Sequence, residues 1–126
     1  MIPKFRAWDK WRDRMSVVDR IYIDTKGVRL YDDFGEYWRD FNDIELMQST
    51  GLKDKNGKEI FEKDILDYNG RKVIVKWHGS YASFIYEFVD ELQNRTTEWK
   101  PLYLSYYHFE IIGNSLENPE LLEVTE

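Results

Sequence analysis

Hydrophobic and polar residues alternate with a period of two in several short segments, and this alternation is typical of half-buried β-strands. The clearest segment is 71–77, in which Val73, Val75 and Trp77 share one face. The other face mixes two lysines with Ile74, as expected for an antiparallel sheet with one solvated side. Further segments with strand-like patterns are 5–8, 15–24, 28–31, 44–48, 65–68, 83–89, 99–104 and 109–112. The sequence therefore predicts seven to nine short strands.

Turns that contain glycine separate these segments. An Asn-Gly pair suits the type I′ turn of a hairpin, because both central residues of that turn need positive φ angles. Asn69-Gly70 lies between two alternating segments and predicts a hairpin that joins 65–68 to 71–77. Asn56-Gly57 has charged neighbours on both sides, so it predicts the tip of a polar loop. Thr25–Gly27 predicts a third turn, which joins the strands 15–24 and 28–31 in a hairpin.

Helical periodicity is present in one segment, residues 33–41. Asp33 followed by Glu36 resembles a capping box, which favours a short helix there. Asn118-Pro119 predicts a terminal helical turn, with Asn as the cap and Pro at the first position. Pro101 restricts the strand around it to a sheet edge or an irregular path. The apolar stripe of the predicted helix is formed by Phe34, Tyr37, Trp38 and Phe41.

The length of 126 residues is that of a single domain, with an N-terminal β and helix part at 1–50 and a second part at 51–126. We expect a mainly β fold, a β-rich α+β domain of antiparallel sheets with one or two short helices. The C-terminal half is expected to curl into a small SH3-like, barrel-like sheet. The predicted core contains Val73, Val75, Trp77, Phe84 and Tyr86, with contributions from Ile21 and Ile111.

The composition is that of a globular, strand-forming chain. Hydrophobic residues are 42%, charged residues 33% and aromatic residues 17% of the sequence. No apolar run approaches the ~20 residues that a membrane helix needs, and the N-terminus lacks a signal-peptide core. We therefore expect a cytoplasmic protein. The net charge of −6 argues against non-specific binding of nucleic acid by the whole chain.

Motifs for catalysis or metal binding are missing from the sequence. With no cysteine, there are no disulfides, thiolate metal sites or cysteine nucleophiles. His78 and His108 are the only histidines, and no zinc-binding spacing includes them. Asp64 is expected to accept hydrogen bonds from turn amides rather than to act as an acid or base. We therefore predict no enzyme activity, catalytic residue, metal or cofactor. The paired carboxylates of the sequence, each at a position where a cap or turn favours aspartate, are Asp32-Asp33, Asp40 with Asp43, and Glu62 with Asp64.

The strongest binding candidate is a basic and aromatic cluster near the N-terminus. Residues 1–14 carry five cations and two carboxylates, a local balance of +3, whereas residues 115–126 carry four glutamates and no cation. Cations mixed with tryptophans suit phosphates and exposed bases. In the alternative interpretation, the tryptophans pack on the sheet and the cations pair with Asp9 and Asp13. The candidate partner-binding residues are Arg6, Trp8, Trp11, Arg12 and Arg14.

Three blocks of the sequence resemble the YopX-like family of small proteins from phages and prophages of low-GC Gram-positive bacteria. The central block is LMQSTGLKDKNGKEIFEKDIL, residues 46–66, and the outer blocks are 4–9 and 112–122. Their order matches the family over nearly the whole chain, which implies a single YopX-like domain over 1–126. One position departs, because Lys63 stands where the family usually has Gly. The resemblance implies fold and phage or prophage provenance, and no biochemical activity.

These observations favour a non-enzymatic binding or regulatory accessory protein that acts through protein–protein contacts. The expected partners are a second copy of the chain, a host protein or a phage protein, reached through exposed aromatic residues and open sheet edges. We expect a homo-oligomer, and no contact with membranes. The alternative is a nucleic-acid-binding module that uses the basic aromatic N-terminal segment.

Overall fold

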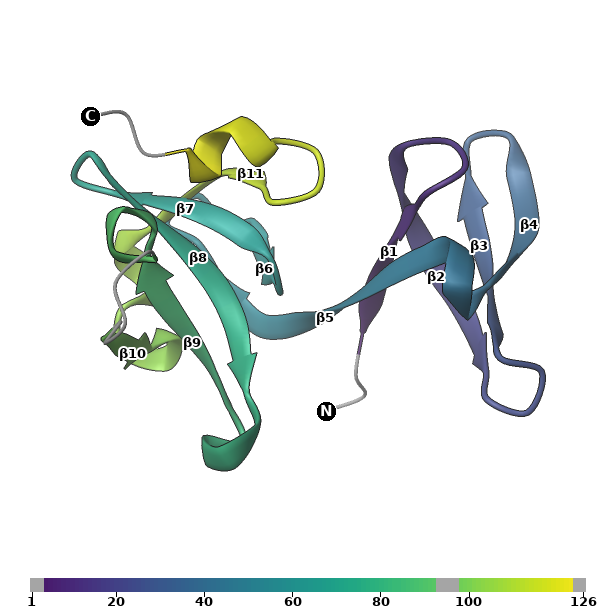
Figure 1. Ribbon diagram of the computed structural model, residues 1–126, viewed down its shortest axis with the longest axis horizontal. Helices are drawn as coiled ribbons and strands as arrows, with labels where there is room; N and C mark the ends of the chain where they lie inside the picture. The colour runs from purple at the N-terminus through teal and green to yellow at the C-terminus, as the bar shows by residue number, and fades with distance from the viewer. Residues whose placement is uncertain (1–3, 93–97, 124–126) are drawn as a thin grey trace. The chain divides into compact units, whose positions relative to one another are not determined.

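The computed structural model describes residues 4–92 and 98–123. Within them the chain forms eleven β-strands and six short 3₁₀ turns, and no α-helix (Figure 1). The mainly β prediction is confirmed. Two compact units divide the chain, Met1–Ser49 and Thr50–Glu126, and the division falls inside one long strand, β5. We call them the N-terminal unit and the C-terminal unit. No helix in the described part is long and apolar enough to cross a membrane.

The N-terminal unit is a meander of antiparallel hairpins to which the start of β5 is added. Its strands have the order β4-β3-β2-β1-β5, and β5 continues into the C-terminal unit, where β6 neighbours it. β1 lies between β2 and β5, so that Ala7 faces Ser16 on one side and Leu46 on the other. The elements are β1 Phe5–Asp9, β2 Arg14–Tyr22, β3 Gly27–Asp32, β4 Gly35–Asp40, a 3₁₀ turn Phe41–Asp43, and β5 Ile44–Lys53.

The predicted helix at 33–41 is wrong, because most of this segment is strand β4. The two faces of β4 contact different partners, as a period of two requires. Tyr37 shares a hydrogen bond of 2.6 Å with Ser16, while Trp38 packs tightly over Gly27. A Cβ atom at Gly27 would lie 2.0 Å from the Trp38 ring, so only glycine fits beneath it. Tertiary packing on both faces therefore overrides the helical spacing of the aromatic residues.

The C-terminal unit contains a five-stranded antiparallel sheet in the order β10-β9-β8-β7-β11. Five 3₁₀ turns accompany it, at Gly79–Tyr81, Val89–Glu91, Leu102–Leu104, Tyr106–His108 and Pro119–Leu122. The predicted barrel-like closure is wrong, because β10 and β11 end the sheet on its two sides within the described residues. The strands are β6 Glu59–Phe61, β7 Asp64–Tyr68, β8 Arg71–His78, β9 Ser83–Phe88, β10 Trp99–Pro101 and β11 Glu110–Asn114.

The hairpin predicted at Asn69-Gly70 is confirmed. β7 pairs with β8 in the register of a two-residue turn, with Tyr68 opposite Arg71. Asn69 has φ of +51° and Gly70 has φ of +88°, the positive values that the turn demands. Pro101 also lies as predicted, in the edge strand β10.

The core prediction is correct in part. Val73, Val75 and Tyr86 are buried in the core of the C-terminal unit, with Phe84 and Ile111 packed against it. Trp77 is the error, because its side chain is 47% exposed. Ile21 contributes to the separate core of the N-terminal unit. The residues that the prediction lacked in the C-terminal core are Ile60, Leu66, Leu102 and Phe109.

Candidate functional site

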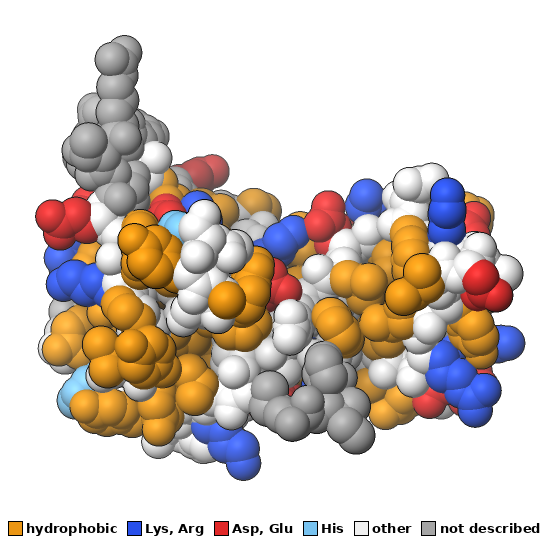
Figure 2. All heavy atoms as spheres, turned by 90° about the horizontal axis from the view of Figure 1, so that it is seen from below, with side chains coloured by type: hydrophobic (Ala, Val, Ile, Leu, Met, Phe, Trp, Pro, Cys, Tyr) orange, Lys and Arg blue, Asp and Glu red, His pale blue; other side chains and the backbone are white. Residues whose placement is uncertain are grey.

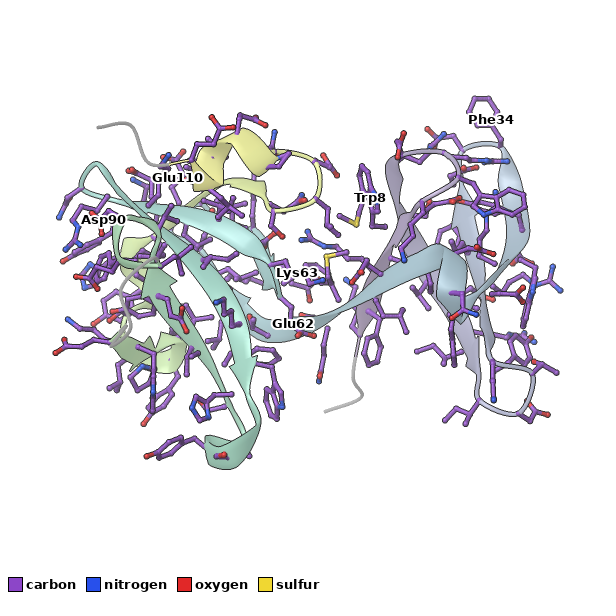
Figure 3. All side chains as sticks on the ribbon, in the orientation of Figure 1. Trp8, Phe34, Glu62, Lys63, Asp90 and Glu110 are labelled. Carbon is purple, nitrogen blue, oxygen red and sulfur yellow. The ribbon has the colours of Figure 1, made fainter. Side chains whose placement is uncertain are left out.

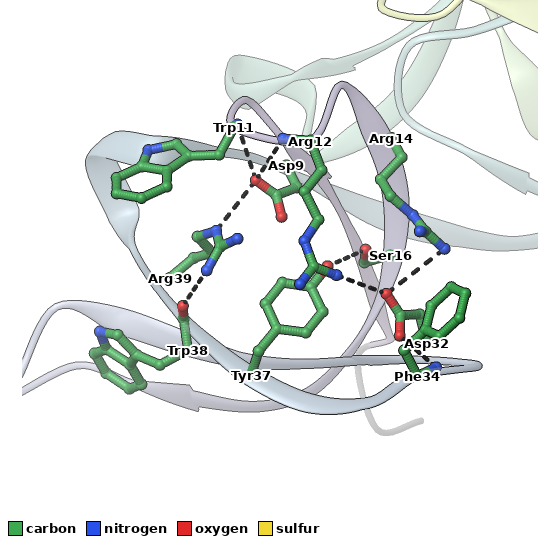
Figure 4. Close-up of polar contacts among 10 residues, drawn as sticks. All are labelled: Asp9, Trp11, Arg12, Arg14, Ser16, Asp32, Phe34, Tyr37, Trp38 and Arg39. Carbon is green, nitrogen blue, oxygen red and sulfur yellow. Dashed lines mark hydrogen bonds and ion pairs between the residues drawn. The ribbon is translucent and has the colours of Figure 1, made fainter.

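The carboxylate of Asp9 organises the loop that carries most of the predicted binding cluster. Asp9 ends β1 and is fully buried. Its Oδ1 accepts hydrogen bonds from the backbone N–H of Trp11 at 2.9 Å and from Nε of Arg39 at 3.2 Å (Figure 4). The backbone N–H of Arg12 lies 3.4 Å from the same oxygen. The aspartate therefore fixes the β1–β2 turn and ties it to β4.

Arginine side chains stack on aromatic rings around this carboxylate. Arg39 lies over the rings of Trp11 and Tyr37, with its guanidinium carbon 5.1 and 4.7 Å from the two centroids. Arg12 lies over the Tyr37 ring as well, at 4.3 Å. Such stacking on an aromatic face is worth about 0.5–1 kcal/mol at exposed sites and more where water is excluded. The cluster is thus a structural network that joins the β1–β2 turn to β4.

A second carboxylate, Asp32, links the cluster to the tip of the β3–β4 hairpin. Its Oδ2 lies 3.1 Å from Arg12 Nη1 and 3.5 Å from Arg14 Nη2. Its Oδ1 accepts the backbone N–H of Phe34 at 2.8 Å. Gly35 has φ of +120°, which lets the chain turn at this point. Two arginines therefore hold the aspartate that shapes the hairpin tip.

The structure brings together only part of the predicted cluster. Trp11, Arg12 and Arg14 gather around the β1–β2 turn, and Trp11 is 71% exposed. Arg6 and Trp8 alternate with the buried residues of β1, so they lie on the opposite face of that strand.

The cations of this cluster are largely neutralised. Arg12 and Arg14 form ion pairs with Asp32, and Arg39 forms an ion pair with Asp9. Three arginines against two aspartates leave a balance of +1 in this network. A groove that follows a phosphate backbone needs a larger excess of cations.

The sequence interpretation missed Asp32, Tyr37 and Arg39 as members of this network. Tyr37 and Arg39 were hidden because the segment 33–41 was interpreted as a helix, and Asp32 was noted only as one of two adjacent carboxylates. The signal that was available is the pair Asp32 and Gly35, an Asp-x-x-Gly spacing in which the carboxylate caps a backbone N–H two residues on.

In the C-terminal unit, two buried carboxylates, those of Asp54 and Asp64, accept hydrogen bonds from backbone amides. Asp54 accepts the N–H of Asn56 and of Lys58 on Oδ1, each at 2.9 Å, and that of Ile111 on Oδ2 at 3.0 Å. Burial of this carboxylate favours a higher pKa, but the three backbone hydrogen bonds outweigh burial and hold the pKa below its ordinary value. Asp64 accepts the N–H of Phe61 at 2.8 Å, the turn-capping role that the sequence predicts.

The two histidines lie among aromatic rings. His78 packs against Tyr81 and Trp99, with centroid distances of 4.8 Å to each, and Trp77 meets Phe84 at 5.0 Å. We call these five residues the aromatic end of the β8–β9 hairpin. His108 lies 4.2 Å from the ring of Tyr107. No cluster of three or more potential metal ligands is found in the described part of the chain.

Hydrophobic side chains are exposed on the surface of the C-terminal unit (Figure 2). A pocket of about 580 Å³ lies within this unit, between the residues that precede β7, the later part of β8 and the C-terminal turn. Ile74, Trp77 and Leu122 give it apolar walls, and Lys63 and Lys76 line it as well. We call it the Trp77 groove. β7 pairs with β8 only as far as Ile74, so the groove opens beside β8 beyond that point.

The family model for YopX protein matches residues 4–123. The chain belongs to the YopX family. The resemblance noted in the three sequence blocks is thereby confirmed.

Among solved structures, the chain is similar to protein EF1440 from Enterococcus faecalis, known from a crystal structure. The two are 32% identical, with 98% of this chain and 99% of that chain covered, and the TM-score is 0.63. A comparison with functionally curated proteins gives no match.

The outer YopX block at the C-terminus forms a loop closed by two asparagines. Asn114 Oδ1 accepts the backbone N–H of Leu116 and of Glu117, while Asn118 Oδ1 accepts the N–H of Asn114 at 3.2 Å. Asn118 stands at the cap position of the terminal 3₁₀ turn with Pro119 at its first position, as predicted, but the Asn118 side chain bonds back to β11 and makes no capping hydrogen bond. A Cβ atom at Gly113 would lie 2.4 Å from Asn118 Oδ1, which explains the glycine of this block.

Lys63, which departs from the YopX pattern, has a backbone conformation that favours glycine. Lys63 has φ of +69°, in the left-handed region that glycine enters without cost. Its N–H donates to the carbonyl of Val75 at 2.9 Å, and its own carbonyl accepts the N–H of Ser115 at 3.0 Å. The backbone is therefore held on both sides in a conformation that costs a lysine about 1–2 kcal/mol. The glycine usual in the family would relieve that strain.

Proposed function

We propose that this YopX-family chain is a non-enzymatic binding protein that acts through protein–protein contacts. The observation that carries the proposal is the aromatic end of the β8–β9 hairpin, where Trp77 is 47% and Tyr81 is 65% exposed. Tyrosine and tryptophan are enriched among the residues that dominate binding energy at protein interfaces. Two buried carboxylates of this unit, Asp54 and Asp64, accept hydrogen bonds from backbone amides, which is a structural role.

The alternative, a nucleic-acid-binding module, keeps some support from the exposure of Trp11. Stacking of bases on exposed aromatic rings needs a positive track beside them for the phosphates. The arginines near Trp11 are paired with Asp9 and Asp32, and the whole chain carries a charge of −6. These charges favour the protein-binding role.

Cross-linking in a bacterial host, followed by mass spectrometry, tests the proposal. The test variant is Tyr81→Ser, and the matched control is Ile23→Ser, which removes an apolar side chain of similar exposure at 80% from the N-terminal unit. We expect a protein captured by the wild type and by the control to be lost from the Tyr81 variant.

A salt titration with single-stranded DNA and RNA completes the test. Binding through phosphates releases counterions, so its affinity falls steeply as salt rises. We expect no binding of this kind at physiological ionic strength. Tight binding with a steep salt dependence, weakened by Trp11→Ala, would overturn the proposal in favour of the nucleic-acid role.

A further inference from the structure

Two Asn-Gly pairs lie in turns of the C-terminal unit, Asn56-Gly57 and Asn69-Gly70. All four residues are exposed, and a Cβ atom at either glycine would meet nothing within 4 Å. Asparagine is a thermolabile residue, and a following glycine has no side chain to hinder attack by its own backbone nitrogen on the asparagine side chain. Sequence and exposure are alike at the two pairs, so a difference in their reactivity must come from hydrogen bonding.

Loss of the asparagine amide needs two groups that are free to approach each other. The backbone nitrogen of the glycine loses its proton to hydroxide and attacks Cγ of the asparagine. The N–Cγ bond forms and the Cγ–Nδ2 bond breaks, and the leaving nitrogen takes a proton from water, which gives ammonia and regenerates hydroxide. Water then opens the succinimide ring at one of its two carbonyl carbons and leaves aspartate or isoaspartate.

Hydrogen bonds restrain both groups at Asn56-Gly57. The Gly57 N–H donates to the carbonyl of Asp54 at 3.0 Å, and the Asn56 N–H donates to Asp54 Oδ1 at 2.9 Å. Asn56 Nδ2 donates to Oε1 of Glu110 at 3.4 Å, and Glu110 begins β11 (Figure 3). The Gly57 nitrogen can therefore lose its proton only when its bond to Asp54 opens.

Neither restraint is found at Asn69-Gly70. Within the described residues, the side chain of Asn69 and the N–H of Gly70 make no hydrogen bond. The turn is held from its flanks, where Tyr68 pairs with Arg71. The attacking nitrogen and the side-chain amide are therefore both open to water and hydroxide.

Conversion of Asn69 changes the hairpin that this residue forms. A two-residue type I′ turn fixes the register of the strands it joins. Isoaspartate carries the main chain through its side-chain carboxyl carbon and adds a methylene to the turn, which the two-residue loop cannot accommodate. β8 contributes Val73 and Val75 to the core, so a change of register there displaces buried side chains.

We propose that Asn69 is a site of spontaneous deamidation, and that isoaspartate formed there opens the β7–β8 hairpin. The fold sets the rate of this modification, which is slow at Asn56 and fast at Asn69. Water and hydroxide are the reagents, so the reaction takes place in the isolated chain. The proposal is independent of the protein-binding function above.

Incubation of the purified chain at mildly alkaline pH, followed by proteolysis and mass spectrometry, tests the site. We expect Asn69 to be converted roughly tenfold faster than Asn56, the factor that about one hydrogen bond makes in a rate. In concentrated urea the two rates should become similar, because the unfolded chain lacks the turn hydrogen bonds. Glu110→Ala frees the Asn56 side chain and should raise the rate at Asn56 in the folded protein.

Two glycine substitutions separate the effect on the hairpin from general ageing. Asn69→Gly removes the site and keeps a Gly-Gly pair that suits the same turn. Asn56→Gly removes the other pair and is the matched control. After incubation, the wild type and Asn56→Gly should contain a population that has lost amide-exchange protection in β7 and β8, whereas Asn69→Gly should keep it.

Two results would overturn the inference. One is conversion of Asn69 in the folded chain at a rate equal to that of Asn56 or lower. The other is conversion of Asn69 to isoaspartate with unchanged exchange protection in β7 and β8. Neither measurement involves a binding partner, so failure here and failure of the cross-linking experiment are distinguishable.

Discussion

Within the described residues, the buried hydrophobic cluster of the N-terminal unit has four members and no aromatic ring, whereas that of the C-terminal unit has seven members, two of them aromatic. Ala7, Val28, Leu30 and Ile44 form the first cluster. The second contains Ile60, Leu66, Val73, Val75, Tyr86, Leu102 and Phe109. The N-terminal unit compensates with a buried aspartate and stacked arginines. Two small sheets of one chain are thus held by different chemistry, and substitutions should separate the two.

The largest expected effect is in the apolar core of the C-terminal unit. Phe109 is 1% exposed and packs edge-on against Tyr86 at a centroid distance of 4.9 Å. Phe109→Ala should lower the free energy of unfolding of this unit by about 3–5 kcal/mol, measured by urea denaturation. Trp77→Ala serves as the control and should cost less than about 1 kcal/mol, because Trp77 is half exposed. Equal losses for the two variants would contradict the core assignment.

The next effect breaks the polar network of the N-terminal unit. Asp9→Ala leaves Arg39, whose side chain is 16% exposed, without its carboxylate and removes the acceptor of the Trp11 amide. We expect a cost of about 3 kcal/mol, the scale for a buried pair that loses one partner. Amide hydrogen exchange should show the lost protection in β2 and β3, with β7 and β8 unchanged. Equal loss in both units would show that they unfold together rather than as separately stabilised sheets.

The smallest effect is a gain of stability at the YopX position occupied by lysine. Lys63→Gly removes the strain of a positive φ, and the flexibility of glycine in the unfolded chain offsets part of the benefit. We expect a net gain of about 0.5–1 kcal/mol in thermal or urea unfolding. Lys63→Ala keeps the strain and should give no gain. Destabilisation by glycine would show that the Lys63 side chain matters more than its backbone.

Local signals predicted the hairpins, and non-local packing decided the rest. Asn69-Gly70 could be recognised because its turn type depends on two adjacent residues. The segment 33–41 misled because aromatic residues at helical spacing also suit a strand that packs on both faces. Trp77 continues the alternation of β8 past the end of the core, so its exposure is set by where β7 begins.

The binding cluster was predicted from composition, but the ion pairs and hydrogen bonds within it depend on the fold. The proximity of Arg12 and Arg14 to Asp32 depends on pairing between β2 and β3, which no spacing in the sequence reveals. The positive φ at Lys63 could be anticipated, because the YopX family usually has glycine at this position. Asp64 as a turn acceptor followed from its position alone.

The hydrogen bond from the Ile111 amide to Asp54 bears on the order in which the two units fold. These residues lie 57 positions apart, and β11 must also reach β7 before the second sheet is complete. The N-terminal unit pairs β1 to β4 through successive hairpins and then adds the start of β5. During synthesis, all strands of the N-terminal unit therefore leave the ribosome well before β11, which the C-terminal sheet needs for completion. Pairing between neighbours in sequence is also faster. The first unit should fold during synthesis, and the second after it.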